Sequence, residues 1–236
     1  MIEDPKKVVI FGANGAIGHA LSDHYAGAGA DVLAITREAH DFDHQNITNL
    51  VIDYYDAQSF DALFLGGAPD IIITALGALC IEEKMPEKSL RDISEKYMEE
   101  LYRINTVVPT LIIKHVLACM PRDHTFIFGT LSARVGSISD NHLGGWYSYR
   151  ASKAALNMVI KTAAIEVGRK NKHAVMVGLH PGTVDSNLSK PFQNNVPNEK
   201  LFTPEQSAQY LANVIAGLTT EHSGKVLDWK GACIDP

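Results

Sequence analysis

The chain alternates between short runs of apolar, mostly β-branched residues and longer stretches in which apolar positions recur every three or four residues. Runs of the first kind, typical of buried strands, occupy 8–11, 31–36, 50–53, 70–75, 125–131, 174–179 and 225–228. Stretches of the second kind, typical of helices, occupy 16–28, 57–64, 90–102, 106–120, 147–169 and 204–217. This alternation predicts an α/β fold, a doubly wound parallel sheet of about seven strands with helices on both faces.

Length and composition favour one domain over 1–236. No Pro/Ser-rich linker, repeat or low-complexity tract divides the 236 residues. The net charge of −6 disfavours nucleic acid and anionic membranes as partners. The first residues lack the apolar segment of a secretory signal, and no apolar run is long enough to span a bilayer. We therefore expect a cytoplasmic protein, in which Cys80, Cys119 and Cys233 are buried, reduced thiols.

A glycine-rich turn follows the first predicted strand and opens the first predicted helix. Gly12 allows a tight turn, Gly15 lets a phosphate approach the backbone, and Gly18 lets helix and strand pack closely. The free N–H groups at the helix start, together with the helix dipole, then attract phosphates. The turn could also be an ordinary glycine-rich connection, but its position between strand and helix favours dinucleotide binding.

Tyr149 and Lys153 are the candidate catalytic pair. They lie four residues apart in a predicted helix, so both side chains share one face. We expect the Lys153 ammonium to lower the pKa of the Tyr149 phenol, which could then exchange a proton with a carbonyl or alcohol oxygen near neutral pH.

Asn105 precedes Pro109 by four residues in another predicted helix. Because proline has no N–H, the Asn105 carbonyl loses its helical partner and needs another, commonly water. The alternative is a helix kink without a chemical role.

These features occur in the order and approximate spacing of a known family, which the sequence resembles from Gly12 to about Gly231: the short-chain dehydrogenase/reductases. The segments 136–141 (GSISDN) and 144–157 (GGWYSYRASKAALN) are similar to the C-factor and sniffer-type carbonyl reductase branch. One position and one loop depart from the family pattern. Phe11 stands where a threonine is typical, and Thr74-Ala75-Leu76-Gly77 replaces Asn-Asn-Ala-Gly, so that loop must make its hydrogen bonds differently.

The resemblance implies a Rossmann-type domain that transfers hydride between a nicotinamide cofactor and a carbonyl or secondary alcohol. It implies that Tyr149 transfers the proton, that Lys153 lowers the pKa of Tyr149 and holds the ribose, and that Asn105 orders a water linking Lys153 to solvent. The implied catalytic residues are Asn105, Ser132, Tyr149 and Lys153. The implied cofactor-binding residues are Gly12, Asn14, Gly15, Ile17, Gly18, Arg37, Asp53, Gly77, Tyr149, Lys153, Pro181, Gly182, Val184 and Ser186.

The resemblance also implies a hydroxyl that hydrogen-bonds the substrate oxygen. The commonest family spacing, counted from Gly136, gives Ala133, and the nearest hydroxyl is one residue earlier, on Ser132. Adjacent strand residues face opposite ways, but a loop at a strand end can rotate to compensate. Ser132 is our candidate, with Ser137 and Ser139 as alternatives.

The end of the second predicted strand bears on the choice of cofactor. It reads Thr36-Arg37, without the acidic residue that would bind a ribose 2′-hydroxyl. Arg37 offers a cationic fork to a 2′-phosphate, which favours NADP(H) over NAD(H), although Glu38 could weaken the preference. Arg37 could also be only a solvated surface residue.

Two other interpretations remain open. The run 40–44 (HDFDH) carries metal-ligand side chains, but they come from a single loop, so we expect a solvated loop and no metal site. The C-factor resemblance also permits a nucleotide-binding signalling protein in which catalysis is secondary.

We further expect residues 187–202 to form a lid over the substrate. Segments 106–120 and 147–169 are apolar on more than one side, and the family resemblance places them at a twofold interface. We therefore expect a homodimer, or a homotetramer, acting on a small-molecule substrate.

Overall fold

A central sheet with helices on both faces organises the chain, of which the computed structural model describes residues 6–81 and 84–236. Within these residues the sheet has eight strands. Seven are parallel, in the order β9-β6-β5-β4-β1-β2-β3: β1 (Lys7–Phe11), β2 (Asp31–Thr36), β3 (Ile47–Val51), β4 (Ile71–Thr74), β5 (Ile127–Leu131), β6 (Val175–His180) and β9 (Val226–Asp228). The doubly wound α/β fold is therefore confirmed.

Short elements complete the sheet and extend its edge. The eighth strand, β10 (Cys233–Ile234), is antiparallel to β9 and too short to give a sequence pattern. A separate parallel pair joins β7 (Thr183–Val184) to β8 (Leu201–Phe202). Both ends of the segment expected to be a lid are thus anchored in regular structure.

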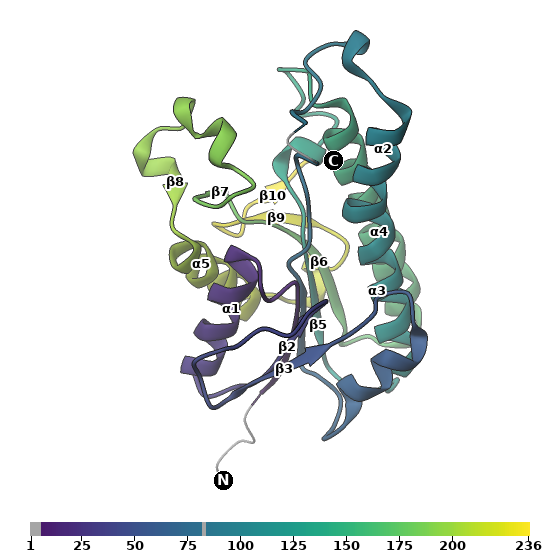
Figure 1. Ribbon diagram of the computed structural model, residues 1–236. Coiled ribbons are helices and arrows are strands. Elements are labelled where there is room, and N and C mark those ends of the chain that lie inside the picture. The colour runs from purple at the N-terminus through teal and green to yellow at the C-terminus, as the bar shows by residue number, and fades with distance from the viewer. Residues whose placement is uncertain (1–5, 82–83) are drawn as a thin grey trace.

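The helices form two layers (Figure 1). α1 (Ala16–Gly27) and α5 (Pro204–Ala216) cover one face of the sheet. α2 (Glu95–Tyr102), α3 (Val108–Cys119) and α4 (Tyr147–Lys170) lie on the other side. Parallel strands that are covered on both faces must be apolar throughout, which is why their sequences read as continuous apolar runs.

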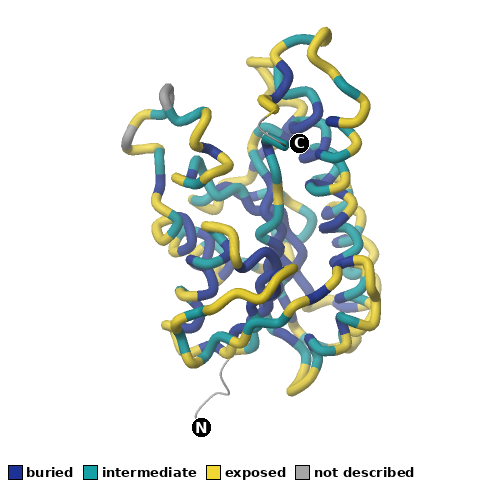
Figure 2. Tube along the Cα trace, in the orientation of Figure 1, coloured by how far each residue is buried: buried dark blue, intermediate teal, exposed yellow. Residues whose placement is uncertain are grey.

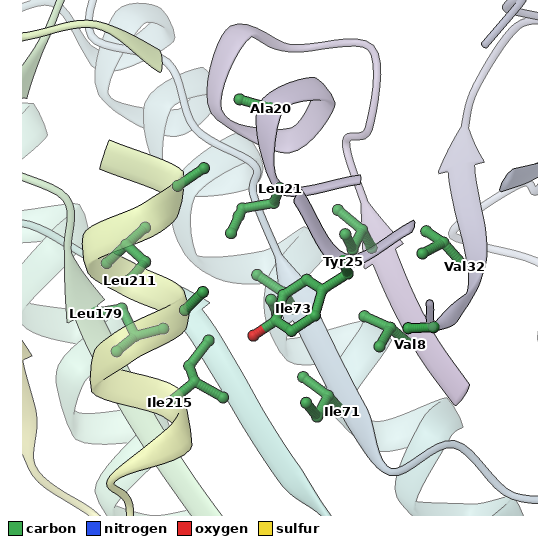
Figure 3. Packing of buried hydrophobic residues seen from close by; sticks show 14 of the residues in the cluster. Val8, Ala20, Leu21, Tyr25, Val32, Ile71, Ile73, Leu179, Leu211 and Ile215 are labelled. Atoms are coloured by element: carbon green, nitrogen blue, oxygen red, sulfur yellow. The ribbon is translucent and has the colours of Figure 1, made fainter. Parts of the chain in front are cut away.

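The strand β1 shows how the two layers divide the core. Val8 and Ile10 pack in the cluster beneath α1 and α5, whereas Val9 and Phe11 pack in the cluster beneath α3 and α4. All four are 0% exposed. Figure 2 shows this buried centre, and Figure 3 shows the first cluster, in which Leu21 and Leu211 meet Ile73 across the helix–sheet boundary. Burying each such side chain contributes roughly 1.5–3 kcal/mol.

Several predicted elements differ in form from the expectation. The strand expected at 50–53 is Ile47–Val51, a half-buried edge strand whose polar positions hide the pattern. The stretch 57–64 is a 3₁₀ helix, and the helix expected at 90–102 begins with a short 3₁₀ turn. A π-helical turn (Arg103–Val107) precedes α3, beside the missing N–H of Pro109.

The cysteines are free thiols, but the expectation that they are buried was wrong, because none of the three is buried. Cys119 and Cys233 are exposed, and Cys80 is half-buried. Cys119 ends α3, where its Sγ lies 3.8 Å from Asp61 Oδ1, and Cys233 lies on the short outer strand β10. Separately, none of the helices in the described residues has the length and apolar character needed to cross a membrane.

Candidate active site

The predicted site residues gather along the carboxyl edge of the parallel sheet. The glycine turn follows β1, Arg37 follows β2, Gly77 follows β4, and Ser132 follows β5. The chain order reverses between β1 and β4, and ligands of such sheets bind at this switch point. In Figure 1 the segment with β7 and β8 stands above this edge on the side of α1 and α5.

The glycine turn has the geometry of a phosphate cradle. Gly12 has φ +76°, and a Cβ at Gly18 would lie 2.2 Å from the Gly12 carbonyl oxygen. Gly15 is the N-cap of α1, and no side chain among the described residues caps this helix. The first turn of α1 contains no acidic residue, and Asn14 and Gly15 are exposed, so its N–H groups are open to an anion. Ile17 is half-buried and packs against the core. These residues fit a dinucleotide phosphate.

Tyr54, which sequence reasoning missed, lies close to Arg37 and to the glycine turn. Arg37 is exposed, whereas Tyr54 is only 5% exposed. Burial raises the pKa of Tyr54 to about 12, and the nearby Arg37 guanidinium and Gly12 backbone oppose that rise. Tyr54 is thus close to both Arg37 and the Gly12 backbone. The exposed Asp53 accepts a hydrogen bond from the Tyr55 N–H through Oδ1 (2.9 Å).

The turn after β6 is built for close backbone packing. Gly182 has φ +79°, and a Cβ there would lie 2.5 Å from the Phe202 ring. The Pro181 carbonyl accepts a hydrogen bond from the Ser207 hydroxyl (3.0 Å). Val184 is buried in β7, and its carbonyl accepts the Ser186 hydroxyl at 3.3 Å. These bonds fix the backbone of a turn whose residues the family resemblance assigns to cofactor binding.

Tyr149 and Lys153 lie on one buried face of α4. Tyr149 is 8% exposed and Lys153 is 3% exposed, and Lys153 Nζ donates to the Leu131 carbonyl at the end of β5 (3.0 Å). Burial raises the pKa of Tyr149 to about 12 and lowers the pKa of Lys153 to about 8. The expected lowering of the Tyr149 pKa is therefore wrong for this structure, because burial disfavours the charged phenolate.

Asn105 ties the loop after β4 to α4. Its side chain donates to the Ala78 carbonyl (2.8 Å) and accepts from the Ala78 N–H (2.9 Å). It also donates to the Ser152 hydroxyl (3.2 Å). These bonds are the different arrangement that the altered 74–77 sequence requires. A Cβ at Gly77 would lie 3.3 Å from Asn105 Oδ1 and 3.4 Å from Lys153 Nζ, so the structure brings these three residues together.

The three candidate serines form hydrogen bonds with groups other than Tyr149. The buried Ser132 hydroxyl donates to Asn157 Oδ1 on α4 (2.5 Å), while Ala133 packs in the apolar cluster that contains Tyr149. The hydroxyl of Ser139 donates to the Pro236 carbonyl (2.5 Å), and that of Ser137 accepts from the Asp140 N–H (3.1 Å). The assignment of the substrate-binding hydroxyl to Ser132 stays a prediction.

Tyr149 shares an apolar cluster with aromatic side chains that sequence reasoning did not find. The Trp146 ring lies 6.3 Å from that of Tyr149 and 4.8 Å from that of Phe192, measured between centroids. Phe192 belongs to the segment expected to be a lid, so this segment reaches the proposed catalytic residue. The same cluster includes Leu79, Tyr97 and Leu101. A substrate at Tyr149 would meet a largely apolar surface.

The histidine-rich run follows β2 as a loop. The His40 and His19 rings pack against Phe42, with centroids 4.9 Å and 5.1 Å from its ring. His44 Nδ1 accepts the Asn46 N–H (3.1 Å). Throughout 6–81 and 84–236, no group of three or more His, Cys, Asp or Glu side chains is placed to hold a metal ion.

Comparison with known protein families identifies this arrangement. A family model described as short chain dehydrogenase matches residues 6–197. The chain belongs to this family. It is accordingly an oxidoreductase of the short-chain dehydrogenase/reductase type, and the resemblance found in the sequence is confirmed.

Relatives and solved structures agree with the family. The chain is 30% identical over 226 residues to 1-hydroxy-2-glutathionyl-2-methyl-3-butene dehydrogenase of Rhodococcus sp. (strain AD45), covering 92% of this chain and 94% of the relative. It is 31% identical over 143 residues to C-signal of Myxococcus xanthus, covering 61% and 81%.

Two solved carbonyl reductases share the fold. One is the NADPH-bound enzyme from chicken fatty liver, with a TM-score of 0.81, 23% identity and coverage of 98% of this chain and 99% of that chain. The other is Sniffer of D. melanogaster, with a TM-score of 0.80, 19% identity and coverage of 98% and 100%.

Proposed function

We propose that this protein is an NADP(H)-dependent oxidoreductase that interconverts a carbonyl and a secondary alcohol, with Tyr149 as the proton donor and acceptor. The placement of Tyr149 and Lys153 carries the proposal. They share a buried face of α4 at the carboxyl edge of the sheet, along which the open phosphate cradle also lies. The family membership supports the reaction class.

The side chains divide the work. The cofactor supplies or accepts the hydride. Burial raises the pKa of Tyr149 to about 12, so the phenol holds its proton at neutral pH and can donate it to a carbonyl oxygen. Lys153, anchored on Leu131, holds a positive charge beside the ribose position and the loop at Gly77. Asn105 holds that loop, and Ser132 is the proposed donor to the substrate oxygen.

The preference for NADP(H) rests on Arg37. Its exposed guanidinium lies near the Tyr54 hydroxyl and the glycine turn, where a 2′-phosphate would accept bidentate hydrogen bonds. Arg37→Ala should weaken NADPH binding by roughly 1.5–3 kcal/mol, the scale of a charge-assisted hydrogen bond, and leave NADH binding nearly unchanged. Equal losses for both cofactors would assign the arginine a structural role instead.

A second copy of the chain is the proposed macromolecular partner. A groove of about 770 Å³ between α3 and α4 is lined by Ile113, Leu117, Val159 and Ala163, and Met158 beside them is 65% exposed. This paired apolar surface suits a twofold contact, in which one patch is used twice. We also propose the cytoplasm as the location, where free thiols are usual.

One observation supports the alternative of a nucleotide-binding signalling protein, namely the similarity to C-signal over 61% of this chain. A pure nucleotide-binding role does not require a buried phenol beside a buried amine. The gathering of chemistry-bearing side chains at one edge of the sheet therefore favours an enzyme.

Oxidation of NADPH in the presence of a panel of aldehydes, ketones and quinones tests the proposal. We expect at least one compound to be reduced to its alcohol, with NADPH a better cofactor than NADH. Tight NADPH binding without turnover of any compound would favour the signalling role.

A further inference from the structure

A buried carboxylate outside the assigned site meets the start of the catalytic helix. Glu87 is 1% exposed, and it forms no ion pair with any residue in the described part of the chain. A buried charge without a cation needs hydrogen bonds. Glu87 Oε2 accepts the Ser148 N–H (3.3 Å), and Oε1 accepts the Ser148 hydroxyl. The positive end of the α4 dipole thus balances its charge.

The helix α4 requires such a partner because it has no cap of its own. Its N-cap residue is Trp146, a residue type that offers no capping acceptor, and its first turn contains no acidic residue. Trp146 is also the non-glycine residue with positive φ (53°) in the described chain, a conformation that persists only when its surroundings impose it. The Glu87 carbonyl accepts the Trp146 N–H (2.6 Å). The backbone of Glu87 thus binds Trp146, and its carboxylate binds Ser148.

The contacts of Glu87 also affect the position of the proposed catalytic residue. Tyr149 directly follows Ser148, and the Trp146 ring contacts both Tyr149 and Phe192. We propose that Glu87 is a positioning residue, which fixes the entry into α4 and thereby places Tyr149 and the Trp146 ring that borders the substrate. This inference rests on the proposed role of Tyr149.

Kinetics of Glu87 variants with two active ketones, one aromatic and one small and aliphatic, test the proposal. Glu87→Ala should lower kcat by about 10–100-fold, the scale for a small misplacement of a reacting group, and change the ratio of the two KM values. NADPH affinity should stay near that of the wild type, because the cradle lies on α1. Glu87→Gln should recover most of the activity, since its amide oxygen still accepts the Ser148 N–H.

Asp92→Ala is the matched control. Asp92 also accepts hydrogen bonds from a helix start, at the Ser89 N–H and hydroxyl, but it lies in a short turn of the same segment and has no hydrogen bond to α4 among the described residues. The Asp92→Ala substitution should leave kcat and both KM values unchanged. If Glu87→Ala does not fold, Ser148→Ala decides: it should give a smaller loss of kcat of the same kind, and wild-type kinetics in this variant would overturn the proposal.

Trp146 emission gives a readout independent of turnover. The chain has two tryptophans, so Trp229→Phe leaves Trp146 as the reporter. In that background Glu87→Ala should shift the emission to the red, as the ring leaves Tyr149 and Phe192. An unchanged spectrum together with wild-type kcat and KM ratio would contradict positioning by Glu87. Retained turnover in Tyr149→Phe, by contrast, would contradict the proposed function itself.

Discussion

Burial sets the protonation of the two side chains at the centre of the proposed chemistry. Tyr149 and Lys153 could be predicted from their spacing, because four residues in a helix define a shared face. Their pKa values could not, since spacing carries no information on solvent exposure. In the folded protein both side chains lose water, so the neutral forms of phenol and amine are favoured.

The pH dependence of stability tests the burial of Lys153. Its pKa is about 8 in the folded protein and 10.5 ordinarily, so between these values the unfolded chain binds more protons. The stability of the wild type should therefore rise with pH relative to Lys153→Met across this window, by roughly 2–4 kcal/mol in total. Below pH 8 the difference should be flat, with the full cost of the buried charge present.

Urea unfolding of the cofactor-free proteins at several pH values measures this difference. Comparison with Lys153→Met cancels the titration of the buried tyrosines, which both proteins share. A difference that does not change between pH 7 and pH 10.5 would mean that Lys153 is solvated in the folded state.

Ser132 is the residue whose role the sequence left most open. A one-residue offset decides which way a side chain faces, and the structure directs Ser132 to Asn157. If Ser132 donates to the substrate oxygen, Ser132→Ala should lower kcat/KM by about 10²–10³-fold, as the loss of an oxyanion donor does. Asn157→Ala, which breaks the same bond but keeps the hydroxyl, should cost far less. Equal losses would assign the serine a structural role, and losses in Ser137→Ala or Ser139→Ala alone would relocate the donor.

At the scale of elements, strands buried on both faces were the most predictable features. Residues 31–36 form β2 as expected, because the positions after the exposed Asp31 must be apolar or small to fit between two layers. The edge strand β3 was misplaced, since half-exposed positions tolerate polar residues. The π-helical turn at Asn105 could be predicted only as a disturbance near Pro109, because proline removes a hydrogen bond without specifying its replacement.

The glycine turn gives a prediction with an internal control. Gly18→Ala should lower the free energy of unfolding and weaken NADPH binding, because its Cβ would lie 2.2 Å from the Gly12 carbonyl oxygen. Gly27→Ala, at the other end of α1, meets no atom within 4 Å and should stabilise the helix by about 0.5–1 kcal/mol. Urea unfolding and NADPH titration measure both effects. Equal behaviour of the two variants would contradict close packing at the turn.

At the scale of the whole molecule, contacts between distant segments could not be predicted from the sequence. The pattern predicted the strand ends and thus the common edge on which the site residues lie. It could not predict that Glu87 meets Ser148, 61 residues later, or that Phe192 meets Trp146. Such contacts depend on loop conformation, which no apolar periodicity encodes.

Assembly is the prediction that belongs to this scale. We expect sedimentation equilibrium at micromolar concentration to show a homodimer or homotetramer, because the groove between α3 and α4 leaves apolar surface in water in a single chain. Met158→Glu should dissociate the assembly by placing a charge in this contact. Leu143→Glu, at a residue that is 92% exposed and outside α3 and α4, should not. A single wild-type species near 25.7 kDa would exclude the prediction.

The most direct test of the proposed chemistry is the turnover of Tyr149→Phe with NADPH and a substrate from the panel. The substitution removes one hydroxyl from a buried ring and should leave the fold and NADPH binding intact. Tyr147→Phe, two residues earlier in the same turn of α4, is the matched control and should keep its turnover. We predict that Tyr149→Phe lowers kcat by at least about 100-fold, the contribution of a general acid. Near-normal turnover in this variant would contradict the mechanism.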